Sequence, residues 1–452
     1  MKKVKKRALY ALLPVGAALL CMCIYIIIFA FNGSQRASAR FNHAVYNRRG
    51  VLVMGTLTDR DGTVLAGIGE DGMRTFAESS DVRRATLHAV GDLQGNIGTG
   101  ALSVYNTELI GYNFLTGIYS RMGEGSTVAM TIDSRLNIEA LRALDGRPGA
   151  VLVMNYLTGE ILCMVSSPTF DPLNPPADAI SNPMLEGIFL NRAISSAYTP
   201  GSVFKLVTTA AAIENMPDVF ERVFECSASL EAPGGVITCS RAHGKMNFEE
   251  ALTVSCNNVF GALALELGVD TLAAYVESFG LAERTTVGGI LTARGNFEKA
   301  APGSANLAWS GIGQFRNTVC PAAMLRFVAA IANEGVAVEM RLLKSGFLSS
   351  IIPGGSQRIM PRETALRLGG MMEYSVHQPS GVVSAFPGLE IHAKTGTAEV
   401  GGGRLPNAWF AGYIANEGFP LAYVVVVENG GGGYAVASPI ANRVLQAAVG
   451  GQ

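Results

Sequence analysis

The most informative part of the sequence is Pro200-Gly-Ser-Val-Phe-Lys-Leu-Val-Thr-Thr-Ala-Ala-Ala-Ile-Glu214. Pro200-Gly201 favours a turn, and apolar residues follow at helical spacing, so a helix is expected to begin at Ser202. Lys205 then lies one turn later on the same face. A serine hydroxyl becomes a good nucleophile when a base takes its proton, and a lysine whose pKa is lowered by burial and a second cation can do this. The pair is a candidate catalytic site, although a capping serine beside a surface lysine fits the same pattern.

A second polar motif, Ser255-Cys-Asn257, precedes the apolar run Val259–Leu265. A serine hydroxyl can relay a proton to a leaving amine, and an asparagine amide can hold a substrate carbonyl and orient the lysine. A polar helix cap is the alternative interpretation. Ser304-Ala-Asn306 matches the same pattern, but it lies in a loop flanked by Pro and Gly. We therefore expect Ser255 and Asn257 in the site.

The third motif is Lys394-Thr-Gly-Thr397, at the end of an apolar strand pattern. Gly396 allows a substrate backbone to lie against the strand, as an added antiparallel strand does. Lys394 and the hydroxyls of Thr395 and Thr397 are suited to binding a carboxylate. The backbone N–H groups of Thr397 and Ser202 are candidates for an oxyanion hole. An ordinary strand end with a glycine bulge is the alternative.

The regions around these motifs predict an α+β fold. Two apolar runs separated by Asn155–Gly159 predict a β-hairpin, three more strands are expected late in the chain, and Ser438–Val449 is expected to form a closing helix. The five expected strands are Ala150–Met154, Glu160–Val165, Leu389–Thr397, Ala408–Ile414 and Leu421–Glu428. Helical periods dominate between 202 and 375, notably over Phe248–Gly268. This order predicts a five-stranded antiparallel sheet with helices.

The N-terminus predicts a membrane anchor. Met1–Arg7 carries five cations, and Ala8–Phe31 has no charged residue over 24 positions, whereas about 20 apolar residues span a bilayer. Because the cations precede the run, residues 1–7 are expected in the cytoplasm, 8–31 in the membrane and the rest outside. A cleaved signal peptide is the alternative, since Ala37-Ser-Ala39 looks like a cleavage site, but the run exceeds a usual signal core.

The segment 32–147 carries no chemical motif and is expected to form a small stalk domain, with short β-like runs at Val51–Leu57 and Thr63–Ala66. Residues 148–452 are expected to form the catalytic domain. The chain has 35 basic and 36 acidic residues, so it lacks the basic footprint of nucleic-acid binding.

Among the seven cysteines, one pair is a candidate for a disulfide. Cys226 and Cys239 flank a Pro-Gly-Gly turn, and an extracytoplasmic compartment permits a bridge between them if their Cα atoms approach. No Cys-x-x-Cys and no histidine pair at ligand spacing is present. We therefore expect neither a metal site nor a cofactor.

The order of the three motifs resembles that of the monofunctional, class B penicillin-binding proteins, which are peptidoglycan D,D-transpeptidases. The likeness covers about 150–452 and is strongest to the short members of the family. It includes Gly149–Asn155, Thr158–Pro168, Asn191–Ile194, Tyr198–Lys205, Gly311–Gln314, Ala393–Glu399 and Asn407–Tyr413. Cys320 stands where a threonine is usual. In the N-terminal part, Asp59-Arg60-Asp61-Gly62 resembles a family signature loosely.

The resemblance implies a mechanism. Ser202, activated by Lys205, attacks the carbonyl of the penultimate D-alanine of a stem peptide. The terminal D-alanine leaves, protonated through Ser255 and Lys394, and an amine of a neighbouring stem peptide resolves the acyl-enzyme. Penicillins are expected to acylate the same serine. The resemblance also implies a glycosyltransferase partner of the elongation or division machinery.

Three alternatives stay open from the sequence. A β-lactamase shares the motifs, but it has no use for a stalk of about 115 residues and usually needs an extra base. A D,D-carboxypeptidase differs only in using water as the acceptor. A catalytically silent scaffold or β-lactam sensor is disfavoured because all three motifs are intact.

Overall fold

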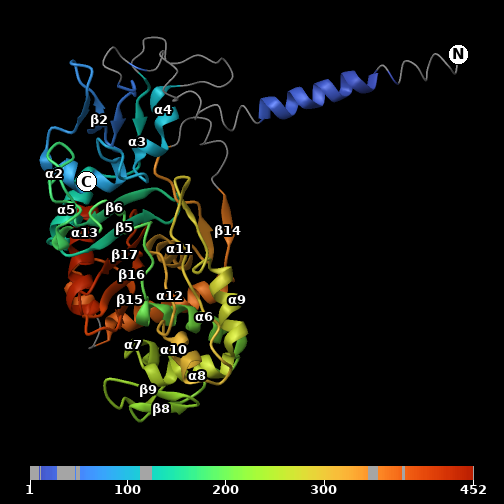
Figure 1. Ribbon diagram of the computed structural model, residues 1–452. Coiled ribbons are helices and arrows are strands. Elements are labelled where there is room, and N and C mark those ends of the chain that lie inside the picture. Colours follow the sequence, from blue (N-terminus) through green and yellow to red (C-terminus); the bar gives the residue numbers. More distant parts are fainter. Residues whose placement is uncertain are drawn as a thin grey trace.

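The computed structural model describes residues 10, 12–27, 46, 51–111, 125–344, 355–378 and 382–450. The predicted cytoplasmic tail, 1–7, and the candidate cleavage site, Ala37–Ala39, lie outside these residues. Within the predicted anchor, Leu12–Ile27 is an apolar helix that projects from the rest of the molecule (Figure 1), and its side chains are exposed. Among the described residues, no single helix has both the length and the hydropathy of a membrane span. Asn257–Leu267 and Val269–Ser278 reach these values only together, across a bend of 98°.

A five-stranded antiparallel sheet forms the centre of the molecule, which confirms the predicted fold class (Figure 1). Its strand order is β15 (Ile391–Ala398), β16 (Asn407–Ile414), β17 (Leu421–Val427), β5 (Gly149–Asn155) and β6 (Ile161–Ser167). Every residue of β17 is buried, as expected for an apolar, β-branched strand that has neighbours on both sides. The sheet therefore joins the late strands to the hairpin that precedes the first motif.

The two faces of the sheet belong to two separate cores. On β17, Tyr423 and Val425 belong to a cluster with α5 (Ser134–Leu144) and α13 (Ser438–Gly450). Val424 and Val426 belong to a second cluster with α11 (Pro321–Ala332). This alternation follows from the period of two along a strand. The sheet is consequently covered by helices on both faces.

The mainly helical region between 202 and 375, called the insert below, lies on the face of the sheet that α11 covers. A short 3-10 helix, η3 (Gly201–Phe204), leads directly into α6 (Lys205–Asn215), near the predicted start. The predicted helix Phe248–Gly268 is broken into α7 (Phe248–Thr253) and α8 (Asn257–Leu267). Ser255, which lies between α7 and α8, has a left-handed backbone with a φ of 54°, so a continuous helix was the wrong prediction here.

Two small two-stranded sheets extend from the insert, and the second of them lies at the end of the molecule opposite β2 (Figure 1). They are β7 (Phe224–Cys226) with β10 (Gly244–Met246), and β8 (Ser229–Ala232) with β9 (Gly235–Thr238). The remaining elements of the insert and of its C-terminal side are short strands and helices: η2 (Pro183–Leu185), α9 (Val269–Ser278), β11 (Thr286–Val287), β12 (Ile290–Leu291), α10 (Ala305–Gly311), β13 (Val336–Val338), β14 (Ser356–Arg358), α12 (Arg362–His377), η4 (Val383–Ala385) and η5 (Gly433–Ala437).

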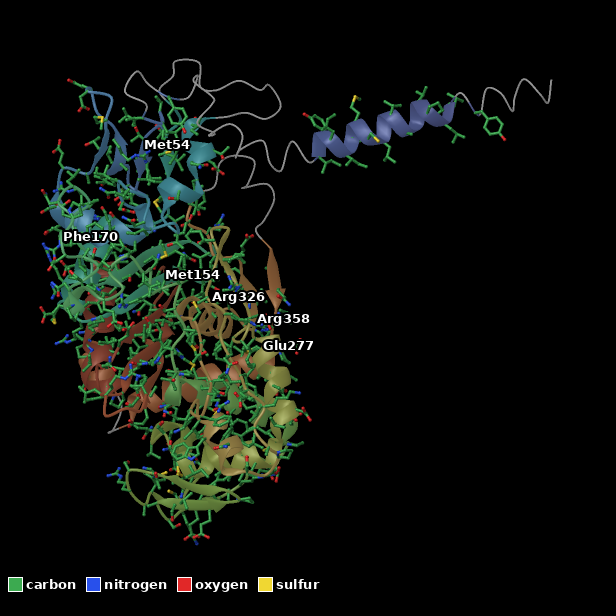
Figure 2. All side chains as sticks on the ribbon, in the orientation of Figure 1. Met54, Met154, Phe170, Glu277, Arg326 and Arg358 are labelled. Atoms are coloured by element: carbon green, nitrogen blue, oxygen red, sulfur yellow. The ribbon has the colours of Figure 1, made fainter. Side chains whose placement is uncertain are left out.

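The N-terminal segment forms a four-stranded sheet in the order β3-β2-β1-β4. Its elements are β1 (Leu57–Thr58), β2 (Val64–Ile68), β3 (Arg74–Phe76), α2 (Ser80–Val90), α3 (Ala101–Val104), α4 (Asn106–Ile110) and β4 (Val128–Ala129). The predicted β-run at 63–66 falls in β2, whereas only the last residue of the run at 51–57 is in a strand. Met54 of this segment and Met154 of β5 belong to one continuous buried cluster (Figure 2).

Candidate active site

Lys205, the first residue of α6, is fully buried and lies at the centre of the site. Its Nζ donates hydrogen bonds to Ser255 Oγ at 3.0 Å, to Asn257 Oδ1 at 2.8 Å and to the Ser255 carbonyl oxygen. Burial, and then the charge of Lys394, hold the pKa of Lys205 well below its ordinary value. The amine is thus disposed to give up its proton and act as a base.

Ser202 lies in η3, one turn before Lys205, and is half-buried. It lines a cleft of about 430 Å³ together with Ser255, Asn257, Thr395 and Thr397. Three stretches of chain that are far apart in sequence therefore meet at one cleft. Of the predicted site residues, Lys205 and Lys394 are buried behind this surface.

Lys394 is the second buried lysine of the site. It lies in β15, and its Nζ donates to the carbonyl oxygen of Thr395 at 3.3 Å. Burial lowers the pKa of Lys394 to about 8. The charge of Lys394 also disfavours the charged form of Lys205, and a lysine next to another cationic group is one way to obtain a neutral amine for nucleophile activation.

Two glycines allow β15 to lie against the start of α6. A Cβ atom at Gly396 would lie 2.9 Å from the Cβ of Trp409 and 3.0 Å from the carbonyl oxygen of Pro200. A Cβ at Gly201, whose φ is 56°, would lie 2.6 Å from the carbonyl oxygen of Thr397. The prediction attributed Gly396 to space for a substrate, and the structure adds a second reason, which is close packing inside the protein.

Strand β15 is at the edge of the sheet, since within the described part of the chain it pairs only with β16. An edge strand presents unpaired N–H and C=O groups, to which an extended peptide can add. Thr395 and Thr397 of this strand face the cleft, and Thr397 is exposed. The arrangement is therefore suited to a peptide substrate that ends in a carboxylate.

The cleft has further walls that the motifs did not single out. They are Thr238, Cys239, Ser240, His243, Val254, Trp309, Ile312, Gln314 and Glu399. Gln314 belongs to a stretch quoted above for its family resemblance, and the N–H of Gly201 donates to the carbonyl oxygen of Gly313 at 2.9 Å. No sequence signal pointed to Cys239 and His243, because their neighbours in the fold come from other segments.

The cysteines are all free thiols in the structure. The bridge considered between Cys226 and Cys239 is not formed. The Sγ atom of Cys239 lies instead 3.7 Å from that of Cys256, the residue between Ser255 and Asn257.

Residues 149–446 match the family profile described as the penicillin binding protein transpeptidase domain, which is more than half of the chain. The chain belongs to this family. It is a class B penicillin-binding protein of the PbpA/FtsI type and a serine-type D,D-transpeptidase, which confirms the resemblance predicted from the motifs.

Similar proteins are found in several bacteria. Peptidoglycan D,D-transpeptidase PbpA of Mycobacterium tuberculosis is 30% identical over 389 residues, which cover 75% of this chain and 75% of that protein. The ceftriaxone acyl-enzyme complex of penicillin-binding protein A from M. tuberculosis superposes with a TM-score of 0.74 at 27% identity, covering 88% of this chain and 98% of that one. The D,D-transpeptidase domain from Eggerthella lenta has a TM-score of 0.73 at 28% identity, with the same coverages.

Proposed function

We propose that this penicillin-binding protein cross-links peptidoglycan stem peptides through an acyl-enzyme on Ser202. The observation that carries the proposal is Lys205, a buried amine with a lowered pKa, one turn after Ser202 and hydrogen-bonded to Ser255 and Asn257. Because burying an ammonium group costs free energy, burial of Lys205 favours the neutral amine that a general base needs.

In the acylation step, the Ser202 hydroxyl attacks the carbonyl carbon of the penultimate D-alanine while Lys205 takes its proton. The hydrogen bond from Lys205 Nζ to Ser255 Oγ then offers a path for that proton to the leaving nitrogen. The peptide C–N bond breaks, the terminal D-alanine departs as an amine, and an ester to Ser202 remains.

Backbone and hydroxyl groups of β15 would hold the substrate during this step. The N–H groups of Ser202 and Thr397 are assigned to the oxyanion, where one such donor is worth about 10²–10³ in rate. Lys394, Thr395 and Thr397 are assigned to the terminal carboxylate. The free edge beside Gly396 is assigned to the peptide backbone. Asn257, through its amide, is assigned to orienting Lys205 and the substrate carbonyl.

Residues 1–7 are proposed to lie in the cytoplasm, 8–31 in the membrane, 32–147 in a stalk and 148–452 in an extracytoplasmic catalytic domain. The uncharged run of 24 residues after five cations supports this topology. The membrane is also where lipid-linked precursors are polymerised, so we propose a glycosyltransferase of the elongation or division machinery as the partner. Protease digestion of intact spheroplasts tests the topology. A protease added outside is expected to cleave residues 148–452.

Labelling with a fluorescent penicillin, followed by cross-linking of lipid-linked pentapeptide strands, tests the activity. A stable adduct that Ser202→Ala abolishes, together with dimeric stem peptides, supports the transpeptidase. Rapid turnover of the label would indicate a β-lactamase, release of D-alanine without dimers would indicate a D,D-carboxypeptidase, and the absence of any adduct would indicate a scaffold or sensor. Each of these three results overturns the proposal.

A further inference from the structure

Three cysteines and one histidine gather at the rim of the catalytic cleft. They are Cys226, Cys239, His243 and Cys256, and their ligand atoms all lie within 4.8 Å of one another. Cys226 and Cys256 are fully buried, while Cys239 and His243 are half-buried. Free thiols brought together in this way by separate segments are unusual unless they share a ligand or form a disulfide.

The four residues come from three separate parts of the insert. Cys226 ends β7, Cys239 follows β9, and His243 precedes β10, which pairs with β7. Cys256 precedes the first residue of α8. Their spacing along the chain resembles no linear metal motif, which is why no metal site was expected from the sequence.

Two of the six distances between the ligand atoms match the edges of a tetrahedral site, and all six are within 4.8 Å. Sγ of Cys239 lies 3.7 Å from Sγ of Cys256, and Sγ of Cys226 lies 3.5 Å from Nδ1 of His243. With Zn–S bonds of about 2.3 Å and Zn–N bonds of about 2.0–2.1 Å, the edges of a zinc tetrahedron are about 3.7–3.8 Å between sulfurs and about 3.5 Å between sulfur and nitrogen. A disulfide needs an S–S distance of about 2.05 Å.

We propose that Cys226, Cys239, His243 and Cys256 bind one zinc ion in a closed Cys3His site. Four protein ligands leave no position for water or substrate, so the site is structural and takes no part in bond breaking. Sulfur-rich tetrahedral sets select zinc over magnesium, calcium or manganese, which prefer oxygen ligands. The ligands must bind as thiolates and as neutral imidazole through Nδ1.

The surroundings of Cys239 suit a thiolate. The backbone N–H groups of Asn257 and Asn258 donate to its Sγ at 3.1 and 3.4 Å. Both N–H groups lie in the first turn of α8, where backbone N–H groups have no acceptor within the helix. The helix dipole favours negative charge at this end. The same N–H···S bonds commonly orient the ligands of thiolate metal sites, because outer hydrogen bonds fix the first ligands.

The zinc ion would position the second catalytic motif, a role that rests on the proposed function. Cys256 lies between Ser255 and Asn257, and Ser255 has a left-handed backbone. The Asn257 side chain also donates to the carbonyl oxygen of Thr238, beside Cys239. Tying Cys256 to Cys239 therefore holds Ser255 Oγ and Asn257 Oδ1 toward the Lys205 amine. Ser255 and Asn257 contact the reacting groups, whereas the four metal ligands are positioning residues.

Metal analysis of the full-length protein, purified in detergent without added metal or chelator, tests the site. We expect about one zinc per chain in the wild type, and a loss of at least about tenfold in zinc content in Cys226→Ser and His243→Ala. Cys320→Ser is the matched control, since Cys320 is also a buried thiol but lies outside the cluster, and it should retain the zinc.

Cobalt(II) exchange gives a second measurement that needs no variant and no activity. Bound cobalt should show intense visible d–d bands and thiolate charge transfer in the near ultraviolet, typical of tetrahedral sulfur ligation. If the wild type contains no zinc and binds neither zinc nor cobalt in stoichiometric amount, the proposal is wrong. Mass spectrometry that finds a Cys239–Cys256 disulfide in the native protein overturns it equally.

Chelation followed by return of zinc tests the positioning role. The rate constant for penicillin acylation should fall about tenfold or more in the chelated protein and recover with zinc, while the dissociation constant of the initial, noncovalent penicillin complex should change less than twofold. A protein that holds zinc but acylates equally fast without it keeps the site and loses the positioning role. A protein that holds zinc but is never acylated contradicts the proposed function and not the metal site.

Discussion

At the residue scale, the site depends on two lysines that share a poorly hydrated region. Lys205 and Lys394 are both buried, and each loses proton affinity because hydration of its charge is lost. For Lys205 the charge of Lys394 adds to this effect. In the proposed mechanism, the balance between the two amines would control the pH range in which Ser202 reacts.

Replacing Lys394 by glutamine should move the pH profile of acylation. Removing the neighbouring cation raises the pKa of Lys205, and the reactive form of Lys205 is the neutral amine, so the midpoint of the rising limb should shift to higher pH. The second-order rate constant for a β-lactam should also fall by about 10-fold or more, since the carboxylate loses its partner. Stopped-flow acylation from pH 5 to 10 measures both effects.

Lys299→Gln is the matched control, because Lys299 is exposed and pairs with Asp270 at the surface. Its midpoint should equal that of the wild type. A midpoint in Lys394→Gln that is unchanged, or that moves to lower pH, would show that the charge of Lys394 does not act on the base.

Ser255 and Ser304 provide a matched pair for the second motif. Both begin a Ser-x-Asn stretch, but Ser255 Oγ lies 3.0 Å from Lys205 Nζ, whereas Ser304 Oγ accepts the N–H of Leu307 as the cap of α10. Ser255→Ala should slow acylation by about 10²-fold, because the proton path is lost. Ser304→Ala should cost about 1 kcal/mol of stability and leave acylation unchanged. Equal acylation rates in the two variants would remove Ser255 from the mechanism.

At the element scale, the local patterns predicted most of the sheet but not the break between α7 and α8. Short apolar runs, β-branched in Val424–Val427, define the strands of the five-stranded sheet, and such a run is a local property of the sequence. The residues 248–268 have helical spacing throughout, so nothing local marks the end of α7. Ser255 between the two helices has a left-handed backbone, and the next residues donate backbone N–H bonds to Cys239. These bonds are contacts between segments that are distant in the sequence. The Cys3His cluster could not be predicted from local patterns either, because its residues come from distant segments.

The close approach of β15 to η3 predicts a strong effect of one methyl group. In Gly396→Ala, the new Cβ meets the Pro200 carbonyl and the Val203 side chain at 3.0 Å, so β15 must move away from the nucleophile. Because a displacement of about 1 Å costs about 10²-fold in rate, acylation should fall by that amount. Gel-based labelling with fluorescent penicillin over time measures the rate.

Gly370→Ala serves as the control for this substitution. Gly370 lies in α12 on an exposed position with no atom near its missing Cβ, so alanine should raise stability by about 0.5–1 kcal/mol through helix propensity. Its acylation rate should not change. Unimpaired acylation in Gly396→Ala would contradict the close-packing argument for β15.

At the scale of the whole molecule, the N-terminal segment and the transpeptidase region share one core. The larger buried cluster contains Met54 and Leu57 of the first region together with Met154 of the sheet. Helix α2 also packs on α5 and β6. Composition and motifs separated the two regions by function, but burial between distant segments cannot be inferred from local patterns. The sequence therefore predicted the catalytic sheet better than its connection to the N-terminal segment.

Asp59, which follows β1, is hydrogen-bonded to the start of α5, and α5 packs on β6 of the transpeptidase region. Asp59 is 1% exposed, and its carboxylate accepts the N–H groups of Asp61 and Thr63 at 2.9 and 2.8 Å and the hydroxyl of Ser134 at 2.6 Å. Ser134 is the first residue of α5, which packs on β6 and α13. Loss of the carboxylate leaves these donors without their acceptor, and hydrogen bonds to charged groups are worth about 1.5–3 kcal/mol each at most.

Asp59→Ala should therefore destabilise the transpeptidase region from outside it, by about 2–3 kcal/mol. Both tryptophans, Trp309 and Trp409, lie in the transpeptidase region, so fluorescence during urea unfolding reports that region alone. We expect the fluorescence midpoint to fall together with the midpoint from far-ultraviolet circular dichroism, in one transition. Glu70→Ala, an exposed change in the same N-terminal segment, should leave both midpoints in place. A fluorescence midpoint that stays at the wild-type value while circular dichroism shows an earlier, separate transition would mean that the N-terminal segment unfolds on its own and that the shared core does not couple the two regions.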